Sequence, residues 1–305
     1  MDERAIALLH RHGWNPGDIL GAGMEGTVID LSADEVAKVW HDRHRSDLEP
    51  LLRFGSALEA SPIPFLCSRV IEILEDDGFA VTIEQKVPGQ PLRPDALPDA
   101  PMVTHEEARL MGDALAGLSQ ARTADLNVLP SLPAEKPLFR RSSFGSSLAD
   151  LAERRFAQRP EQLREEIGDI DEIVAALLRR LRDLPDPEMK CLIHGDLIPA
   201  NVLIDDGEVA GLVDFGFLTT VGDPQFDAAV AASSFDMYGP SARHSEQALS
   251  AAFSTRFGHD PTTYGLYRAA YAVITHSYFA SDSQDGHFQW CAQLLTREDV
   301  RDAIA

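Results

Sequence analysis

Oxygen-bearing side chains gather in two short runs in the second half of the chain. The run HGDLIPAN spans residues 194–201, and DFG follows at residues 214–216. Phosphoryl transfer passes through a loose transition state, so a protein that catalyses it mainly positions groups and neutralises charge. That work needs a carboxylate at the attacking hydroxyl and oxygen ligands for Mg²⁺. We therefore expect Asp196 to accept the hydroxyl proton, and Asn201 and Asp214 to bind Mg²⁺.

Three glycines near the N-terminus, Gly21, Gly23 and Gly26, form the pattern GxGxxG. The pattern alone is weak, because dinucleotide-binding folds also carry it and place a helix after it. Here residues 27–31 (TVIDL) have the β-branched, apolar character of a strand. Backbone N–H groups of such a loop can approach phosphate oxygens that a Cβ would obstruct. We interpret the segment as a hairpin loop over nucleotide phosphates; the alternative is an ordinary hairpin turn.

A lysine follows one strand after the glycine loop. Lys38 lies in VAKV at residues 36–39, twelve residues after Gly26. The segment resembles the VAIK strand of protein kinases, whose lysine neutralises the α- and β-phosphates. The alternative is a solvated lysine at a strand edge. A phosphate-binding lysine needs an acid to hold it, and we expect Glu49 to do so because it begins the next helix; Glu59 is the rival.

Taken together, these motifs resemble those of the aminoglycoside phosphotransferase family. That family has HGDxxxxN where protein kinases have HRDxxxxN, and the resemblance runs from Gly21 to about Asp227. It implies a two-lobed protein-kinase-like fold, ATP as the phosphate donor with GTP not excluded, and Mg²⁺. It also implies that His194 braces the loop. Asp227, in the family segment GDPxxD at residues 222–227, is expected to be structural.

Two further features refine the resemblance. Residues 83–89 (IEQKVPG) resemble the hinge that binds adenine through its backbone, so we expect Glu84 and Lys86 to lie at the nucleotide. No APE motif follows residues 214–216, and Gly195 replaces the arginine of the protein-kinase loop. Both departures argue against protein substrates.

The order of predicted elements indicates an α+β chain with two lobes. Residues 1–87 form a small β-rich, nucleotide-binding lobe, and residues 88–305 form a larger helical lobe that carries the catalytic and acceptor-binding groups. In the first lobe, the apolar spacing of residues 46–60 predicts a helix, and Asp76-Asp77-Gly78 predicts a hairpin turn. In the second, residues 190–218 are one β-rich interruption among helices.

The net charge and the cysteine content limit which partners and which compartment we expect. The chain has 27 basic and 49 acidic residues, a formal charge of −22. Such a surface repels nucleic-acid phosphates and anionic lipids and attracts cations. No apolar run reaches the roughly 18 residues of a membrane span, and the three distant cysteines fit reduced thiols. We expect a cytoplasmic protein, monomer or homodimer, without nucleic-acid or membrane partners.

The acceptor is expected to be a small cationic molecule. Candidate acceptor-binding carboxylates are Asp236, Asp282 and Asp285, which lie near several aromatic residues in the sequence. The leading interpretation is an ATP-dependent O-phosphotransferase acting on an aminoglycoside or a related antibiotic. Alternatives are a metabolic kinase for an amino sugar, amino alcohol or nucleoside, and a catalytically inactive nucleotide-binding protein. The inactive alternative does not explain why Lys38 and Asp196 are both present.

Overall fold

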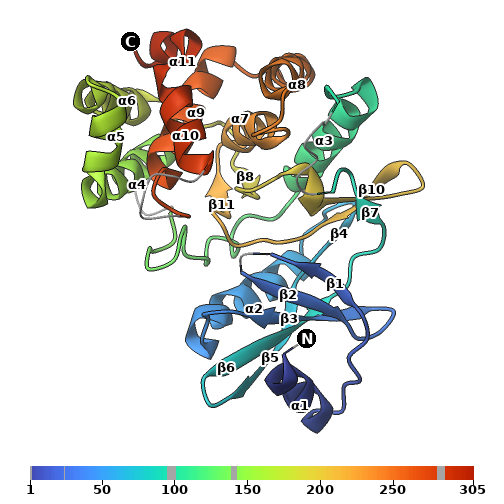
Figure 1. Ribbon diagram of the computed structural model, residues 1–305. Coiled ribbons are helices and arrows are strands. Elements are labelled where there is room, and N and C mark those ends of the chain that lie inside the picture. The colour runs from blue at the N-terminus through green and yellow to red at the C-terminus, as the bar shows by residue number, and fades with distance from the viewer. Residues whose placement is uncertain (1, 24, 95–100, 139–142, 280–285) are drawn as a thin grey trace.

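The computed structural model describes residues 2–23, 25–94, 101–138, 143–279 and 286–305. A β-rich N-terminal part lies beneath a helical C-terminal part (Figure 1), which confirms the predicted α+β, kinase-like class. The N-terminal elements are α1 (Glu3–Arg11), β1 (Ile19–Ala22), β2 (Gly26–Asp30), β3 (Glu35–Trp40), α2 (Arg45–Glu59), β4 (Leu66–Cys67), β5 (Val70–Asp76), β6 (Phe79–Gln85) and β7 (Gln90–Pro91). The helices that follow are α3 (His105–Leu118), α4 (Phe144–Gln158), α5 (Pro160–Glu166) and α6 (Ile170–Asp183). The remaining elements are β8 (Cys191–Ile193), a 3₁₀ turn (Pro199–Asn201), β9 (Val202–Asp205), β10 (Glu208–Leu212), β11 (Thr220–Gly222), α7 (Pro224–Ser234), α8 (Ala242–Phe257), α9 (Pro261–Thr275), α10 (Gly286–Thr296) and α11 (Glu298–Ile304).

The N-terminal sheet is antiparallel, with strand order β1-β2-β3-β6-β5. Successive side chains of a strand point to opposite faces. Ala37 of β3 packs in the cluster that contains Leu8 of α1, whereas Trp40 packs in the cluster that contains Leu48 of α2. Lys38 alternates with Ala37 and therefore lies on the α2 face of the sheet.

Two tight turns connect antiparallel strands, and the first is the hairpin turn predicted at residues 76–78. Asp77 and Gly78, between β5 and β6, have φ values of 46° and 73°. Asp206 and Gly207, between β9 and β10, have φ values of 49° and 79°. Positive φ at both central residues is the signature of the type I′ turn, whose twist matches that of the flanking strands. The turns thus fix the register of both hairpins.

A second sheet joins the two parts of the chain, in the order β4-β10-β9-β7. β4 pairs parallel with β10, and β7 pairs antiparallel with β9. A Cβ at Gly211 of β10 would collide with Leu66 O of β4, so glycine permits this close approach. The hairpin that leads into the DFG segment is therefore anchored on strands from the N-terminal third of the chain. The five-stranded sheet ends at Gln85, and a lobe boundary at residue 87 stays a prediction.

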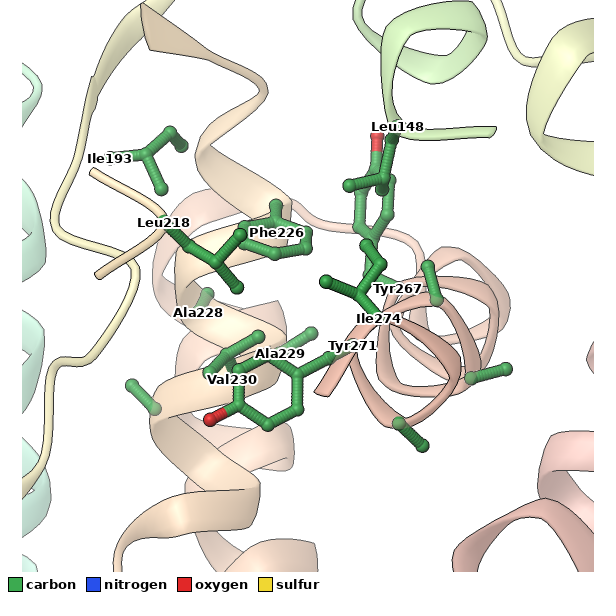
Figure 2. Packing of buried hydrophobic residues seen from close by; sticks show 14 of the residues in the cluster. Leu148, Ile193, Leu218, Phe226, Ala228, Ala229, Val230, Tyr267, Tyr271 and Ile274 are labelled. Carbon is green, nitrogen blue, oxygen red and sulfur yellow. The ribbon is translucent and has the colours of Figure 1, made fainter. Parts of the chain in front are cut away.

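Two buried helices, α7 and α9, form the centre of the C-terminal part. Small residues on α7 allow α9 to approach closely, as Ala229 beside Tyr271 illustrates in Figure 2. The ring of Phe226 lies edge-on to that of Tyr267, with centroids 5.6 Å apart (Figure 2). Aromatic pairs of this geometry stabilise a core beyond their buried area. α7 begins directly after β11, so this core sets the position of the catalytic loop beside it.

The cysteines are structural in the described chain. Cys67, Cys191 and Cys291 are buried free thiols. Burial raises the pKa of Cys67 to about 12, which leaves little reactive thiolate at neutral pH. Within the described ranges no helix has both the length and the apolarity needed to cross a membrane.

Candidate active site

The loop that carries Asp196 runs from β8 to β9 and turns at Gly195. Gly195 has a φ of 86°, and a Cβ there would collide with Phe217 O. Glycine is therefore required at this turn. Asn201 Nδ2 donates to Asp196 O at 2.9 Å. Because its amide nitrogen is used within the loop, the carboxamide oxygen of Asn201 is the atom that could bind a metal, and this role stays a prediction.

Two buried groups brace this loop from behind. Asp227 of α7 accepts hydrogen bonds from the N–H groups of His194 and Gly195, at 2.8 Å and 2.9 Å. His194 is fully buried, and its Nε2 lies 2.9 Å from Val213 O. Burial lowers the pKa of His194 to about 4, so the imidazole is neutral and donates to that carbonyl. This is the bracing geometry that the family resemblance implied for His194 and Asp227.

Lys38 and Asp214 meet across the two parts of the chain. Lys38 Nζ lies 2.6 Å from Asp214 Oδ1 and 3.3 Å from Glu25 Oε2. Burial alone would lower the pKa of Lys38, but the carboxylates of Asp214, Glu84 and Glu25 outweigh burial and raise that pKa. The ammonium also lies 4.1 Å from the Trp40 ring centroid, within cation–π range. Lys38 is thus a buried, permanently charged group beside the DFG carboxylate, not a solvated edge residue.

The glycine loop joins β1 to β2, and its glycines differ in what surrounds them. A Cβ at Gly26 would collide with Val39 O, so this glycine is needed for the packing of β2 on β3. A Cβ at Gly21 or Gly23 would meet nothing within 4 Å, which leaves room for a ligand. The carboxylate of Glu25, in the same loop, bridges Lys38 and Arg43, at 3.3 Å from each.

The structure brings neither predicted helix partner to Lys38, which pairs with Asp214 and Glu25. Glu49 pairs instead with Arg45, at 3.7 Å. Glu59, the rival, pairs with Arg69 at 2.7 Å. For Glu49 the physical reason is the orientation of α2, which buries Leu48 and turns the next residue about 100° around the axis. Glu59 is the last residue of α2, and its side chain is exposed there.

The two predicted hinge residues point in different directions. Glu84 lies at the same pocket as Lys38 and Asp214. Lys86 Nζ binds Asp30 Oδ1 at 2.7 Å, at the end of β2. The Lys86 side chain is thereby committed to the sheet, so a nucleotide contact from this residue would come from its backbone.

The ligand set at the DFG end suits a Mg²⁺ ion that is shared with a nucleotide. Asp214 adopts a φ of 65°, a left-handed conformation that is rare for residues other than glycine and common at functional sites. Burial works against ionisation, but Lys38 outweighs it and lowers the pKa of Asp214, so the carboxylate is charged. Mg²⁺ is often bound by one or two protein oxygens, with waters and phosphates completing its shell. Asp214 and Asn201 fit that role, and no cluster of three or more His, Cys, Asp or Glu suited to a metal occurs among the described residues.

Of the three predicted acceptor-binding carboxylates, the structure describes only Asp236. Asp236, at the end of α7, lies in the electrostatic field of Arg93, and burial raises the pKa of this carboxyl. Its Oδ2 is buried without a hydrogen-bond partner in the described structure. Asp282 and Asp285 lie outside the described residues. For all three, acceptor binding stays a prediction.

Aromatic side chains lie near Asp196, whose carboxylate acts electrostatically on Tyr271 and Tyr278. The ring centroids of Phe217 and Tyr278 are 4.7 Å apart, and those of Tyr278 and Phe279 are 4.8 Å apart. Tyr271 joins them at 6.4 Å from Phe217. Burial and then the Asp196 carboxylate hold the pKa of Tyr271 well above its usual value. We call these four residues the aromatic cluster.

Sequence reasoning missed Glu25, Phe217 and Tyr271. Glu25 occupies a variable position of the glycine pattern, and only the closed hairpin brings it to Lys38. Phe217 follows DFG directly, and that adjacency was an available signal. Tyr271 lies in the largely buried α9, where its position is that of a core residue.

Fold and site together define a phosphotransferase of the kinase type. A sequence profile of the phosphotransferase enzyme family matches residues 20–266, and the chain therefore belongs to that family. This confirms the resemblance to the aminoglycoside phosphotransferases and makes the protein a small-molecule kinase. No curated protein matches the chain in a sequence search.

Solved structures share the fold at low identity. Macrolide 2′-phosphotransferase MphH from Brachybacterium faecium has a TM-score of 0.58 at 18% identity, covering 97% of this chain and 98% of its own. The GDP complex of wild-type aminoglycoside 2′-phosphotransferase-IIIa has a TM-score of 0.63 at 16% identity, covering 98% of each chain. Aminoglycoside phosphotransferase APH(3″)-Id from Streptomyces rimosus, with ADP and streptomycin, has a TM-score of 0.52 at 20% identity, covering 90% of this chain and 99% of its own.

Proposed function

We propose that this protein transfers the γ-phosphate of ATP, with GTP as the alternative donor, to a hydroxyl of a small cationic antibiotic. The observation that carries the proposal is the contact of 2.6 Å between Lys38 and Asp214, beside the loop of Asp196 and Asn201. A cation for phosphates, ligands for Mg²⁺ and a carboxylate for the hydroxyl are the groups that phosphoryl transfer requires.

Each group has a distinct role in the proposed reaction. Lys38 neutralises phosphate charge, and it remains charged because three carboxylates raise its pKa. Asn201 and Asp214 hold Mg²⁺, which supplies further positive charge at the phosphates when bound. Asp196 orients the acceptor hydroxyl and takes its proton as the bond from the hydroxyl oxygen to the γ-phosphorus forms and the bond from that phosphorus to the β-phosphate oxygen breaks, which releases the nucleoside diphosphate. The brace of His194 and Asp227 fixes the loop, so that Asp196 need not reorganise during the step.

The acceptor side favours a molecule with both a cation and apolar faces. Aromatic rings bind cations through their faces and pack against apolar groups such as sugar C–H faces. In the aromatic cluster, the half-buried Phe217 and Tyr278 and the exposed Phe279 offer such surfaces near the Asp196 carboxylate, whereas Tyr271 is buried. The formal charge of −22 favours a cationic acceptor over a neutral one. Amino-sugar antibiotics combine these properties, and among the similar structures one contains streptomycin and another kanamycin.

A turnover assay tests the proposal. The protein is incubated with MgATP or MgGTP and a panel of aminoglycosides, macrolides, amino sugars and amino alcohols, and nucleoside diphosphate release is measured. Release that depends on an antibiotic supports the proposal. Release only with metabolic amino sugars or alcohols would reassign the substrate, and tight nucleotide binding without any transfer would reject the enzyme.

The variant Asp196→Asn separates catalysis from binding. It keeps the size of the side chain but removes the proton acceptor. We expect kcat to fall by roughly a hundredfold to ten-thousandfold, the usual contribution of general-base catalysis, while nucleotide affinity stays close to that of the parent protein. A near-normal kcat in Asp196→Asn would contradict the role of this loop.

A further inference from the structure

Lys38 has two ion-pair partners that the proposed reaction would draw away. Asp214, at 2.6 Å, is the proposed metal ligand. Glu25, at 3.3 Å, belongs to the glycine loop, where nucleotide phosphates would enter. If the proposed function is right, both carboxylates change partners when MgATP binds. A third group must then keep Lys38 in place.

The helix does not supply that group. α2 presents Leu51 and Phe54 to the pocket that Lys38 and Asp214 share. Its acids at 49 and 59 pair with arginines elsewhere. The carboxylate that lines this pocket together with Lys38 and Asp214 comes from the sheet, at Glu84 of β6.

The strand register places Glu84 within reach of Lys38. Lys38 lies directly opposite Thr82, and Val36 lies opposite Glu84. Glu84 is therefore the diagonal neighbour of Lys38 on the same face of two adjacent strands. Diagonal Cα positions are about 7–8 Å apart in an antiparallel pair, a gap that long side chains span.

The Glu84 carboxylate is fixed by its neighbours. Thr82 Oγ1 donates to Glu84 Oε1 at 2.6 Å. Trp40 Nε1 in turn donates to Thr82 Oγ1 at 2.9 Å, and the Trp40 ring carries the Lys38 ammonium. These hydrogen bonds thus orient both the Glu84 carboxylate and the Trp40 ring against which the Lys38 ammonium lies. Burial raises the pKa of Glu84, and the nearby Lys38 cation partly offsets that rise because it favours the charged carboxylate.

We propose that Glu84 is the positioning residue that holds Lys38 toward the nucleotide phosphates, in place of a carboxylate on helix α2. Both residues belong to neighbouring strands of one sheet. Their alignment is consequently independent of where α2 lies.

A double-mutant cycle tests this inference. Glu84→Gln removes the charge, and its amide oxygen can still accept from Thr82. Dissociation constants for MgATP and values of kcat/KM are measured for Glu84→Gln, Lys38→Met and the double variant. We expect Glu84→Gln to lower kcat/KM by about tenfold or more, a coupling typical of residues in one ion-pair network. In the Lys38→Met background the same change should have no further effect.

Three results would overturn it. Glu84→Gln could tighten MgATP binding in both backgrounds, which would mean that the carboxylate merely repels phosphate. It could cause an equal loss in both backgrounds, which would mean that it acts independently of Lys38. Glu49→Gln could match the loss, which would return the role to α2. Glu72→Gln, an exposed acid on the adjacent strand β5, is the matched control and should behave as the parent.

A second variant guards against misfolding. Thr82→Val keeps the charge of Glu84 and removes the hydroxyl that fixes it, so it should give a smaller loss that again requires Lys38; full activity in Thr82→Val and Glu84→Gln alike would refute the inference. The proposed function fails separately, if the parent protein neither binds MgATP or MgGTP nor transfers phosphate. An active parent with unaffected Glu84 variants would reject only the positioning role.

Discussion

The brace behind the catalytic loop gives the protein two opposing responses to acid. His194 has a pKa of about 4 in the folded chain against an ordinary value of 6.5. Its contribution to stability is therefore complete above the unfolded value and is lost as the pH falls toward 4. Asp227 has a folded pKa of about 6 against an ordinary value of 3.8. The folded state binds this proton more tightly than the unfolded state does. Protonation of Asp227 therefore stabilises the folded state as the pH falls from about 6 toward 3.8.

The two effects have calculable sizes. Between about pH 8 and pH 5, proton linkage at His194 removes about 2 kcal/mol from the free energy of unfolding. Over the same interval, proton uptake by Asp227 returns about 1 kcal/mol. The parent protein should therefore show only a shallow net contribution from the brace, although each member titrates strongly.

Urea unfolding of three proteins at a series of pH values separates the effects. Between about pH 8 and pH 5, the free energy of unfolding of His194→Gln should fall by about 2 kcal/mol less than that of the parent, because this variant lacks the imidazole that takes up a proton on unfolding. Over the same interval the free energy of unfolding of Asp227→Asn should fall by about 1 kcal/mol more than that of the parent, because this variant lacks the carboxyl that stabilises the fold when protonated. Asp227→Asn should also be less stable at every pH by about 1–3 kcal/mol, because one carboxamide oxygen cannot serve both N–H donors as two carboxylate oxygens do. Other acids titrate alike in all three proteins and cancel. Parallel pH curves for the three would refute the reasoning.

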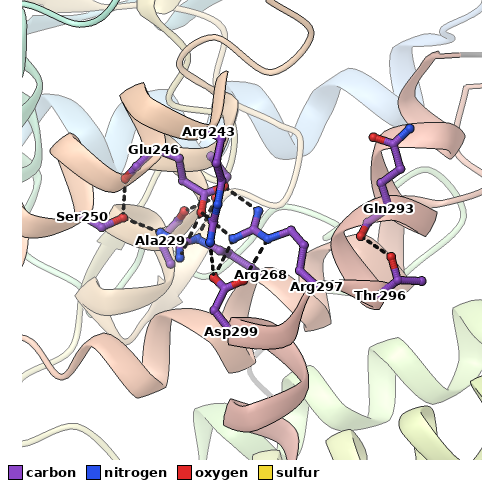
Figure 3. A network of polar contacts seen from close by, with 10 residues as sticks. Ala229, Arg243, Glu246, Ser250, Arg268, Gln293, Thr296, Arg297 and Asp299 are labelled. Atoms are coloured by element: carbon purple, nitrogen blue, oxygen red, sulfur yellow. Dashed lines mark hydrogen bonds and ion pairs between the residues drawn. The ribbon is translucent and has the colours of Figure 1, made fainter. Parts of the chain in front are cut away.

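Two further predictions concern stability away from the brace. Gly26→Ala should destabilise the protein by at least about 1–3 kcal/mol through overpacking, whereas Gly21→Ala, with open space around it, should leave the unfolding midpoint unchanged; equal midpoints would contradict the distinction. Glu246 is buried and is shared by three arginines (Figure 3), so Glu246→Gln should cost about 3–5 kcal/mol in urea unfolding. Asp169→Asn, which breaks an exposed arginine pair, is its matched control and should leave the urea unfolding midpoint close to that of the parent.

The sequence was sufficient for the parts of the site that short motifs encode. The catalytic loop and DFG are separated by one hairpin, and that hairpin forms because the Asp206-Gly207 turn fixes it. Lys38 and Asp214 lie far apart in the chain, yet their meeting followed from the order of the motifs. The helix predicted at residues 46–60 is α2, and its ends differ by a single residue.

Which carboxylate lies beside Lys38 could not be predicted from the order of residues along the chain. Glu49 was chosen because it lies at the start of the helix, but a helix presents a face, and Leu48 and Leu58 already marked that face. Residue 49 follows the buried Leu48 by one position, about 100° around the axis, so helical periodicity alone placed it off the buried stripe. Residue 59 lies eleven positions after Leu48, about 20° from it around the axis, so its exposure follows from its position as the last residue of α2. The placement of Glu84 beside Lys38 could be found only from the register of β3 and β6, which sequence patterns leave undetermined by one residue or more.

The resulting arrangement explains how one lysine remains useful in a strongly acidic protein. Three carboxylates act on Lys38, and they come from the glycine loop, the sheet and the DFG segment. Two of them occupy positions that phosphate and Mg²⁺ would compete for, so the site without nucleotide is already neutralised and does not leave a buried cation unpaired. If MgATP binds as proposed, its phosphates and metal take the place of Glu25 and Asp214 beside Lys38. Glu84 is the carboxylate of the three that we expect to stay beside Lys38, so we expect the register of β3 and β6 to affect catalysis.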